Sequence, residues 1–352
     1  MKSVVNLKSD VYYHGVYWNN YSPVVEYMCK NFTGNPKKWW VEDFKERYAQ
    51  KPFEKALFLN CGDGRWERDF IDKKIVKKVT AFDVSPDLIQ KAKTLKGKRP
   101  IKYFVADANK VDFPRDKFDL VVNYAALHHT QYINRMCRIL AGTIKPDGIF
   151  VNFEYIGPHR NQYPLGEWIL ANLVNRNLPE FVRQDLRYPS LPTMLYMDPS
   201  EAIHSELIMK SIKRYFRIIE KYDTGGGVAY LLLTHNSRTA KLPVKKIRSS
   251  IDRILYYDNL FSRLHLVPQL FTYFVARSNK EALKNRSLNL RYQNEEKSRE
   301  RFADKRRGVY SFIDYLKLIY NCKTLRGRLS LLFRYPYLEN TAFLIKKISS
   351  TF

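Results

Sequence analysis

Two glycines follow a short apolar run in the segment Asn60-Cys61-Gly62-Asp63-Gly64. A glycine directly after a buried strand allows the backbone to approach a ligand that a Cβ would block. The helix expected behind it offers N–H groups and the positive end of its dipole. Asp83 stands 19 positions after Gly64, where a carboxylate is placed to bind a ribose diol.

The spacing of these glycines argues against one common ligand. A dinucleotide-binding loop has a third glycine, which lets the helix pack closely beside the pyrophosphate. In this chain the third position is Glu67, whose carboxylate suits a pyrophosphate poorly. The pattern therefore favours a smaller, zwitterionic ligand without phosphates over NAD.

Apolar runs alternate with helical segments from residue 55 onwards. The expected strands are residues 55–60, 78–84, 101–106, 118–123 and 148–154. Ser85 is the expected N-cap of a helix that begins at Pro86. This alternation predicts an α/β fold with a parallel sheet covered on both faces. Ligands bind such sheets at the carboxyl ends of the strands. The residues at those ends are Gly62, Asp83, Asp107, Asn123 and Glu154.

The composition describes a basic chain with ample material for a core. Of 352 residues, 45% are hydrophobic, and 61 Lys and Arg against 35 Asp and Glu give a net charge of +26. Such a charge attracts phosphate on nucleic acid, anionic lipid or a sugar nucleotide. No signal peptide or membrane-spanning run is evident, so a cytoplasmic protein is expected. The cysteines have no metal-ligand spacing, so no metal site is predicted, and they indicate a reducing compartment: Cys29, Cys61, Cys137 and Cys322.

Five segments follow, in order and spacing, the motif series of class I S-adenosylmethionine-dependent methyltransferases: LFLNCGDG, AFDVSPDLIQKA, FVADANKVDFP, FDLVVNYAALHH and IKPDGIFVNFEYIGP. The chain resembles this family over residues 55–160. The resemblance extends more weakly to about residue 278, because residues 226–236 and 269–280 look like its closing antiparallel strand pair. It implies a Rossmann-like, seven-stranded, mostly parallel sheet with helices on both faces, and S-adenosyl-L-methionine as the cofactor.

The resemblance also implies which residues contact the cofactor. Gly62 and Gly64 would pass the methionine moiety, and Asp83 would bind the ribose hydroxyls. Further residues are implied at the adenine (Asp107 and Ala108), at the methionine and acceptor side (Asn123 and Tyr124), and elsewhere along the cofactor (Asn60, Cys61 and Val84).

Two positions depart from the family's pattern. Asn60 stands where the loop usually starts with glycine, and Phe58 where it often has an acid. Asparagine tolerates positive φ, so the turn survives, but the acid's contact to the methionine ammonium must come from elsewhere or be absent. The segment EYIGPHR, residues 154–160, resembles a subgroup often encoded with glycan-assembly enzymes.

The acceptor side carries residues that move protons. Methyl transfer is an in-line displacement at a carbon bonded to a sulfonium, so positioning supplies most of the catalysis. A hydroxyl acceptor must lose its proton, and a histidine suits that work. We expect His129 or His128 to be the base, with Glu154 and Tyr155 as the competing base and orienting pair. The alternative is that these groups are structural and bond to the backbone.

Other polar residues are weaker candidates. His159 and Arg160 follow the fifth strand, and Asp198 lies in MDPSEAIHSE, which is predicted first as a helix start with Pro199 at its first position. The remaining histidines are expected to be structural: His14, His204, His235 and His265.

Three parts of the chain are expected: a helical, aromatic N-terminal lid (1–50), a methyltransferase domain (51–280) and a basic helical C-terminal extension (281–352). Residues 35–48 are predicted to continue the helix of the lid. The aromatic residues of the lid either cover the cofactor and grip a carbohydrate ring or a base, or pack on the sheet. They are Tyr12, Tyr13, Tyr17, Trp18 and Tyr21.

The last third of the chain holds most of the net charge. From Ser237 to Phe352, 25 Lys and Arg stand against 9 Asp and Glu, a difference of 16. In residues 309–347, basic and apolar residues alternate at helical spacing, which favours an anionic membrane surface or a protein partner. Binding to an anionic membrane surface would place the protein peripherally at the inner membrane face. A further alternative is that this segment docks on the catalytic domain itself.

The sequence thus predicts an S-adenosylmethionine-dependent methyltransferase that O-methylates a sugar, glycan or other small-molecule intermediate. Two alternatives stay open. An RNA methyltransferase fits the charge, but no RNA-binding module is evident, and NYAA stands where base-methylating enzymes carry Asn-Pro-Pro-Tyr. A catalytically inactive scaffold that binds through its basic tail would explain Asn60 and Phe58.

Overall fold

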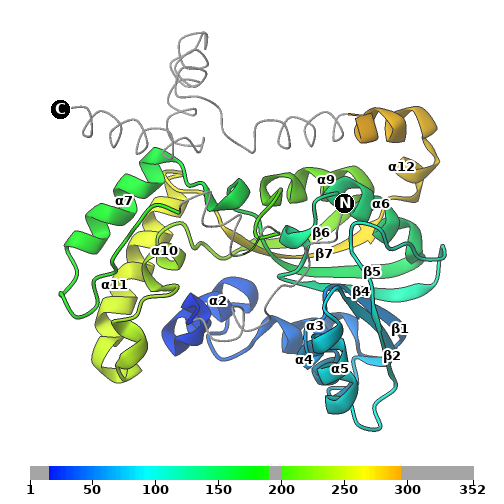
Figure 1. Ribbon diagram of the computed structural model, residues 1–352, viewed down its shortest axis with the longest axis horizontal. Coiled ribbons are helices and arrows are strands. Elements are labelled where there is room, and N and C mark those ends of the chain that lie inside the picture. The colour runs from blue at the N-terminus through cyan, green and yellow to red at the C-terminus, as the bar shows by residue number, and fades with distance from the viewer. Residues whose placement is uncertain (1–15, 190–197, 199, 295–352) are drawn as a thin grey trace.

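A single seven-stranded sheet forms the centre of the molecule (Figure 1). The computed structural model describes residues 16–189, 198 and 200–294. The strand order is β3-β2-β1-β4-β5-β7-β6, and β1 to β5 run parallel, whereas β7 is antiparallel to both β5 and β6. The strands are β1 (Phe53–Phe58), β2 (Val76–Asp83), β3 (Ile101–Val105), β4 (Phe118–Tyr124), β5 (Ile144–Tyr155), β6 (Phe216–Asp223) and β7 (Phe271–Ser278).

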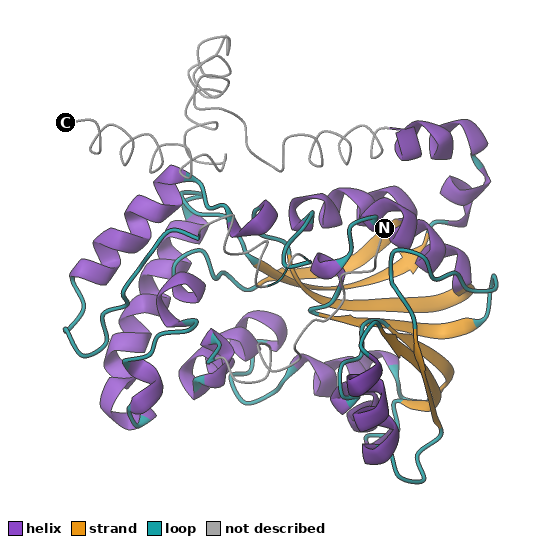
Figure 2. Ribbon diagram, viewed as in Figure 1, coloured by secondary structure: helices purple, strands orange, loops and turns teal. Residues whose placement is uncertain are grey.

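Helices cover both faces of this sheet (Figure 2). The core on one face includes side chains of α2 (Ser22–Thr33), α3 (Trp40–Tyr48), α4 (Arg65–Asp72) and α5 (Pro86–Leu95). The core on the other face includes side chains of α6 (Ile133–Thr143) and α9 (Ile208–Tyr215), against which α12 (Lys280–Lys284) packs. The strand order reverses between β1 and β4, which is where an open α/β sheet binds its ligand. The predicted Rossmann-like fold with a mostly parallel sheet is confirmed.

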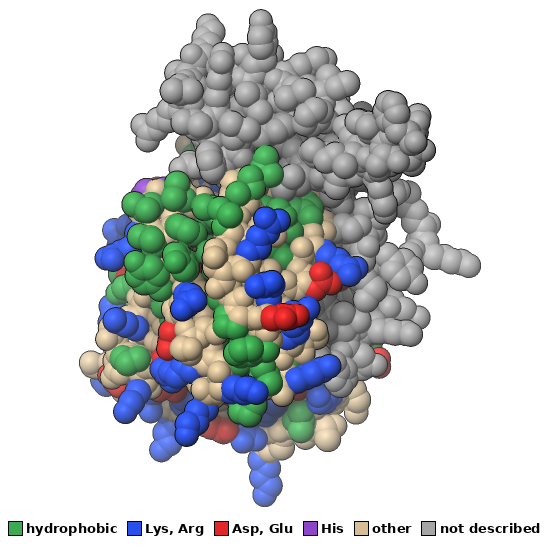
Figure 3. All heavy atoms as spheres, turned by 90° about the vertical axis from the view of Figure 1, so that its left-hand side faces the viewer, with side chains coloured by type: hydrophobic (Ala, Val, Ile, Leu, Met, Phe, Trp, Pro, Cys, Tyr) green, Lys and Arg blue, Asp and Glu red, His purple; other side chains and the backbone are tan. Residues whose placement is uncertain are grey.

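Three further helices form a group at one end of the sheet (Figure 1). They are α7 (Leu165–Arg176), α10 (Ala229–Leu233) and α11 (Val244–Arg263). Short 3₁₀ turns connect the elements: η1 (Trp18–Asn20), η2 (Leu127–His129), η3 (His159–Asn161), η4 (Ser205–Leu207) and η5 (Thr239–Lys241). On this side of the molecule hydrophobic side chains gather at the surface (Figure 3). Ile169 and Leu173 of α7 contribute to the apolar surface, with 48% and 51% of their area exposed.

The predicted helix cap at Ser85 is confirmed. The Ser85 hydroxyl accepts a hydrogen bond from the Leu88 N–H at 3.3 Å, and Pro86 is the first residue of α5. The five predicted parallel strands all form, with ends displaced by at most four residues from the expected positions. Apolar periodicity identifies buried strands well because both faces of this sheet are covered.

The prediction of a strand at residues 226–236 is wrong. This segment contains α10, and the strand that pairs with β7 is β6. The carboxylate of Asp258 accepts hydrogen bonds from the N–H groups of Gly226, Val228 and Ala229 at 2.9, 2.7 and 2.9 Å. A buried acid from α11 therefore satisfies the free N–H groups with which α10 begins, a long-range contact that the local pattern does not reveal.

Two helix predictions also need correction. Residues 35–48 do not continue the preceding helix, because α2 ends at Thr33 and Gly34 adopts a left-handed conformation with φ 75°. A glycine in this conformation is a common helix end. The helix predicted to start at Pro199, which lies outside the described residues, does not form over the described residues after it, since Ser200 to His204 form turns and bends and α9 begins only at Ile208.

Several predictions concern residues outside the described part of the chain. Tyr12, Tyr13 and His14 of the lid are among them, and so are Cys322 and the basic segment 295–352. Within the described ranges, none of the helices combines the length and the apolar character that crossing a bilayer would require.

Candidate functional site

The loop between β1 and α4 is built from residues with positive φ. Asn60, Gly62 and Gly64 have φ of 42°, 55° and 79°. Asparagine is among the few non-glycine residues that adopt this region readily, so the turn survives the replacement of the first glycine. The Asn60 side chain also donates a hydrogen bond from Nδ2 to the carbonyl of Ala126 at 3.1 Å. This bond ties the loop after β1 to the loop after β4.

Gly64 has a packing reason in addition to its conformation. A Cβ at this position would lie 2.2 Å from the hydroxyl oxygen of Tyr103, a residue of β3. The Tyr103 hydroxyl donates to the Gly64 carbonyl at 3.3 Å. The loop therefore lies directly against β3, and only glycine fits between them without a shift of the tyrosine.

Asp83 ends β2 and is held by backbone N–H groups alone. Its Oδ2 accepts from the Gly62 N–H and its Oδ1 from the Ser85 N–H, both at 2.9 Å. The residue is 7% exposed, and this burial raises the pKa of its carboxyl although backbone N–H groups oppose the shift. A carboxylate oxygen can accept more than one hydrogen bond, so each oxygen retains capacity for a ligand hydroxyl.

Glu67 occupies the position of the missing third glycine. It lies in the first turn of α4, is 1% exposed, and its Oε2 has no hydrogen-bond partner among the described residues. Burial raises the pKa of this carboxyl to about 8. The side chain thus fills space under the loop, where a glycine would have left room for the close approach of a pyrophosphate.

The loop after β3 carries the residues expected at the adenine. Asp107 is partly exposed, accepts from the Asn109 N–H at 2.8 Å and lies 3.6 Å from Lys110. Ala108 is buried with 6% of its area exposed. The Ala106 N–H donates to the carbonyl of Asp83 at 2.9 Å. The structure thus brings the strand ends with Gly62, Asp83 and Asp107 together, and Cys61 and Val84 adjoin them in the chain.

At the end of β4, the two residues expected near the methionine make different contacts. Asn123 is fully buried and donates from Nδ2 to Asn152 at 2.7 Å and to Glu154 at 2.8 Å. Tyr124 packs its ring 4.0 Å from that of Trp66, measured between centroids. The Asn123 side chain therefore supports Glu154, and its contact with the cofactor stays a prediction.

Glu154 is the most heavily bonded side chain of the site. It is fully buried, and its oxygens accept five hydrogen bonds of 2.6–3.0 Å. The donors are Asn123 Nδ2, His128 Nδ1 and the N–H groups of Ala126, Leu127 and Tyr155. Burial disfavours the Glu154 carboxylate, but the His128 ring and the other donors outweigh burial and lower the pKa of Glu154. A carboxylate occupied in this way orients His128 and is poorly placed to act on a ligand itself.

The two histidines of η2 differ in their protonation. Burial disfavours the His128 imidazolium, but the ion pair with Glu154 outweighs it and raises the pKa of His128 to about 9. Burial and the neighbouring His128 cation lower the pKa of His129 to about 4. The ring centroids are 4.1 Å apart. At neutral pH the two histidines thus consist of one imidazolium, His128, and one neutral imidazole, His129.

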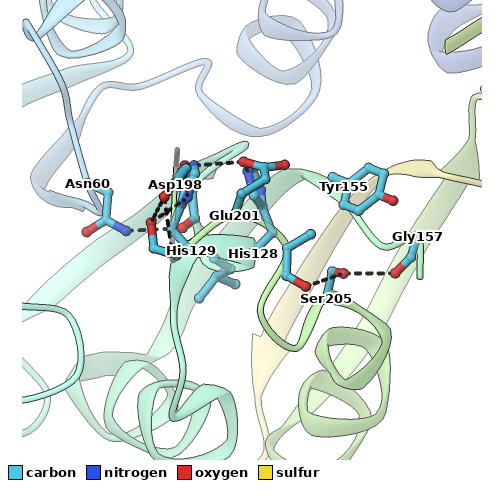
Figure 4. Close-up of polar contacts among 12 residues, drawn as sticks. Asn60, His128, His129, Tyr155, Gly157, Asp198, Glu201 and Ser205 are labelled. Carbon is cyan, nitrogen blue, oxygen red and sulfur yellow. Dashed lines mark hydrogen bonds and ion pairs between the residues drawn. The ribbon is translucent and has the colours of Figure 1, made fainter. Parts of the chain in front are cut away.

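Asp198, Ser200 and Glu201 complete this cluster (Figure 4). The Glu201 Oε2 lies 3.8 Å from the Nε2 of both His128 and His129. The His129 Nδ1 lies 3.2 Å from the Ser200 hydroxyl and 3.9 Å from Asp198. In Figure 4, Asn60 lies on one side of the histidine pair and Tyr155 on the other. Glu201 was missed by sequence reasoning, because it follows the histidines by more than 70 residues in a segment without periodic pattern.

Tyr155 lies at the end of β5 among aromatic rings. Its centroid is 6.0 Å from His128, 6.0 Å from Tyr230 and 5.4 Å from Phe271. Burial raises the pKa of its hydroxyl well above 10. Tyr155 is therefore a neutral phenol at physiological pH, suited to donate a hydrogen bond and not to accept a proton as a base.

The weaker candidates after β5 lie beside the cluster. Arg160 is buried, and its guanidinium donates to the main-chain oxygen of Glu201 at 3.4 Å. His159 donates from Nδ1 to the Ile203 carbonyl at 2.6 Å, and its ring stacks on that of His204. His235 packs against Tyr17, whereas His265 is exposed.

The described part of the predicted lid packs against the body of the protein. Trp18 is 2% exposed and stacks on Phe271 with centroids 5.1 Å apart. Tyr21 is also buried and shares a hydrogen bond of 2.7 Å with Thr239. These two rings pack on β7 and η5, as the structural alternative predicted, whereas Tyr17 is partly exposed.

A hollow of about 680 Å³ lies along α4, away from Asp83 and Asp107. Of the predicted site residues only Tyr124 lines it, together with Trp39, Trp66 and Arg65 among others. The candidate cofactor site is therefore defined by strand ends and hydrogen bonds, and this hollow does not define it.

Comparison with known proteins assigns the segment that carries these loops. Residues 57–152 match the model of a family described as methyltransferase domain. This match covers less than a third of the chain. The match agrees with the predicted resemblance to methyltransferases, and the activity and its cofactor are part of the proposed function. The resemblance of the EYIGPHR segment to a particular subgroup stays a prediction.

Several known proteins are similar to part of the chain. An uncharacterized methyltransferase of Mycobacterium tuberculosis is 28% identical over 123 residues, which cover 34% of this chain and 61% of the relative. The chain thus spans less than two thirds of that relative's length. The mitochondrial arginine-hydroxylase NDUFAF5 of Rattus norvegicus is 28% identical over 107 residues, 30% of each chain. The solved S-adenosylmethionine dependent methyltransferase of Mesorhizobium loti is 17% identical, with a TM-score of 0.43 over 68% of this chain and 96% of that one.

Proposed function

We propose that this chain transfers the methyl group of S-adenosylmethionine to a hydroxyl oxygen of a sugar, glycan or other small molecule. The observation that carries the proposal is the cluster of His128, His129 and Glu201 at the ends of β4 and β5. The Asn60 side chain, which bonds to Ala126, connects the cluster to the loop expected to pass the methionine moiety. A group that must lose a proton before it attacks carbon needs a proton acceptor at this point.

The residues at the ends of β1 to β3, the cofactor half of the site, have separate tasks in this proposal. The Asp83 carboxylate accepts hydrogen bonds from the ribose hydroxyls while Gly62 and Ser85 hold it in place. Asp107 and Ala108 adjoin the adenine. The sulfonium leaves as a neutral thioether and needs no acid, so the rate depends on how well the two substrates are aligned.

The residues at the ends of β4 and β5, the acceptor half of the site, accept and position protons in this proposal. Glu154 orients His128 through Nδ1 at 2.6 Å, so the Nε2 of that ring is directed at Glu201 and at the space beside it. His129 is neutral at physiological pH because its pKa is lowered to about 4. An oxygen acceptor has a use for such a cluster, whereas an amine acceptor that is already neutral has less need of it.

Two observations weigh against an inactive scaffold. Asn60 keeps the loop in its positive-φ conformation, and Phe58 packs edge-to-face on Phe70 in the core with centroids 5.1 Å apart. Both departures from the family's pattern are thus accommodated, Asn60 in the formed loop and Phe58 in the core. A protein or membrane partner of the basic tail remains part of the proposal only as a prediction, since residues 295–352 lie outside the described chain.

Calorimetric titration with S-adenosylhomocysteine tests the cofactor half. We expect micromolar binding that Asp83→Ala weakens by about 100-fold, because two hydrogen bonds to a charged group are lost. Asp87→Ala, an exposed aspartate of the neighbouring helix, is the matched control and should bind as the wild type does. A well-folded wild type that does not bind would favour the scaffold.

Transfer assays with methyl-labelled S-adenosylmethionine test the acceptor. Sugar nucleotides, glycans and total RNA are offered in parallel, and the labelled product is identified by mass spectrometry. The proposal requires label on a hydroxyl of a small molecule or glycan. Label on RNA alone, with a binding constant that falls steeply with salt, would establish the RNA methyltransferase instead.

A further inference from the structure

We propose that His128, His129 and Glu201 form a binding site for a divalent transition-metal ion. Two imidazoles and one carboxylate converge from two segments of the chain, η2 and the turn before η4. One possible ligand atom from each of the three residues, a ring nitrogen of each histidine and a carboxylate oxygen, lies within 4.8 Å of the other two. This donor set, with positions left for other ligands, suits Zn²⁺, Fe²⁺ or Mn²⁺ and not the oxygen-seeking Mg²⁺ or Ca²⁺.

The distances are close to those that coordination requires. The Glu201 Oε2 lies 3.8 Å from each of the two Nε2 atoms. With metal bonds of about 2.0–2.2 Å, neighbouring ligand atoms of a tetrahedral site lie about 3.4 Å apart. A small rotation of the Glu201 side chain, which is 24% exposed, closes that difference.

Each histidine is oriented by its other ring nitrogen. Glu154 bonds to His128 Nδ1 at 2.6 Å, and the Ser200 hydroxyl lies 3.2 Å from His129 Nδ1. Ser200 is fixed in turn by Asp198, which accepts from its N–H and its hydroxyl at 2.9 and 2.7 Å. A carboxylate behind a histidine is the arrangement that sets the tautomer and basicity of metal-ligating imidazoles.

The local charge also favours a cation. The carboxyl groups of Glu154, Asp198 and Glu201 surround the two imidazoles, and the first of them is fully buried. Buried carboxylates need a hydrogen-bonded counter-charge or a metal ion. A divalent ion between the Nε2 atoms and Glu201 would replace the His128 proton as the counter-charge of these carboxylates. The ligands are still reachable from solvent, since 22% of the His129 side chain is exposed.

A second group of similar composition lacks these supports. His159, His204 and Glu206 also bring three ligand atoms within 4.8 Å. The Glu206 side chain is 42% exposed, however, and the His159 ring is positioned by a main-chain carbonyl and not by an acid. This group serves as an internal comparison for the experiment below.

The role of the ion rests on the proposed function. A hydroxyl bound at an open position of the metal has a lowered pKa, so its O–H bond breaks and the proton passes to water. The resulting alkoxide forms the new C–O bond with the methyl carbon while the C–S bond of the sulfonium breaks. The electron pair of that bond remains on sulfur, which leaves as a thioether, and no oxidant or reductant is needed.

Metal titration of the full chain tests the inference. Protein dialysed against chelator is titrated with ZnCl₂ by calorimetry and with CoCl₂ while visible absorption bands report coordination. One equivalent should bind, and His129→Ala and Glu201→Gln should each weaken binding at least tenfold. His204→Ala and His265→Ala should leave it unchanged. No binding by folded wild type, or a loss caused by His204→Ala and not by Glu201→Gln, would overturn the inference.

Cofactor binding in the same samples separates this inference from the proposed function. The variants are checked by circular dichroism and by titration with S-adenosylhomocysteine with and without metal. Binding of metal without S-adenosylhomocysteine would reject the methyltransferase and keep the metal site. Binding of S-adenosylhomocysteine without metal would reject the metal site alone and return His129 to the role of proton acceptor.

Discussion

The two halves of the strand-end surface are stabilised in different ways. In the cofactor half, at β1 to β3, main-chain N–H groups hold the carboxylate of Asp83, and both donors lie in the loops next to it in the sheet. In the acceptor half, at β4 and β5, a fully buried acid accepts five hydrogen bonds, and the turn that contains Glu201 comes from a distant part of the chain. The first arrangement can be encoded by a short motif, whereas the second depends on long-range packing.

This difference has a chemical counterpart. Asp83 bonds only to the backbone and retains lone pairs for a ligand, so it is suited to binding. Glu154 has its oxygens occupied and acts through His128, so it is suited to positioning. The same residue type thus has two roles, and the number of donors around each carboxylate decides which.

The largest effect on stability is expected for Glu154→Ala. It leaves the His128 ring and buried N–H groups without their acceptor, which should cost about 3–5 kcal/mol in the free energy of unfolding. Urea denaturation measures this, with the exposed Glu180→Ala as control, expected within about 0.5 kcal/mol of wild type. If Glu154→Ala and Glu180→Ala both change the free energy of unfolding by less than about 0.5 kcal/mol, the stability of the acceptor half does not depend on its buried acid.

Glu67 tests whether the cofactor half also contains a costly buried charge. Its folded pKa of about 8 lies above the ordinary value of 4.5, so its contribution to stability is complete below pH 4.5 and is lost as pH rises to 8. Glu67→Gln should therefore gain stability over wild type between pH 5 and 8.5, by on the order of 4 kcal/mol. Unfolding is measured at both pH values. A difference between the two proteins that does not change with pH would mean that Glu67 is ionised throughout.

A smaller loss is expected for Gly64→Ala, which sharpens the account of the glycine loop. The methyl group must displace the Tyr103 hydroxyl and adopt φ near 79°, at a cost of about 1–3 kcal/mol. Combining it with Tyr103→Phe removes the nearest contact and should recover part of that loss. Thermal unfolding of both single variants and the double variant gives the coupling energy. Strict additivity would show that the backbone conformation alone requires glycine.

The smallest effect is expected at Asn60. In Asn60→Gly the relief of positive φ and the loss of the hydrogen bond to Ala126 oppose each other, so stability should change by less than about 1 kcal/mol. Asn60→Ala loses the hydrogen bond and still has a Cβ at positive φ, so it should be the less stable of the two variants. Denaturant unfolding compares them. If Asn60→Gly is destabilised as much as Asn60→Ala, the link between the two loops matters more than the turn.

Much of the cofactor half could be predicted from the sequence, because its information is local. The glycine loop, the acid after β2 and the Ser85 cap each lie within a few residues of a strand end, and apolar periodicity located the five parallel strands. The prediction failed where a distant group decides the conformation. Residues 226–236 are apolar enough for a strand, but Asp258 satisfies the N–H groups that begin α10.

By itself, then, the sequence determined the five parallel strands, the conformation of the glycine loop and the pair of histidines after β4. Tertiary structure alone decided that Glu154 turns inward to orient His128 and that Glu201 approaches both rings. The physical reason is that a backbone turn is set by the φ preferences of its own residues, whereas a buried polar cluster exists only where packing brings donors and acceptors together.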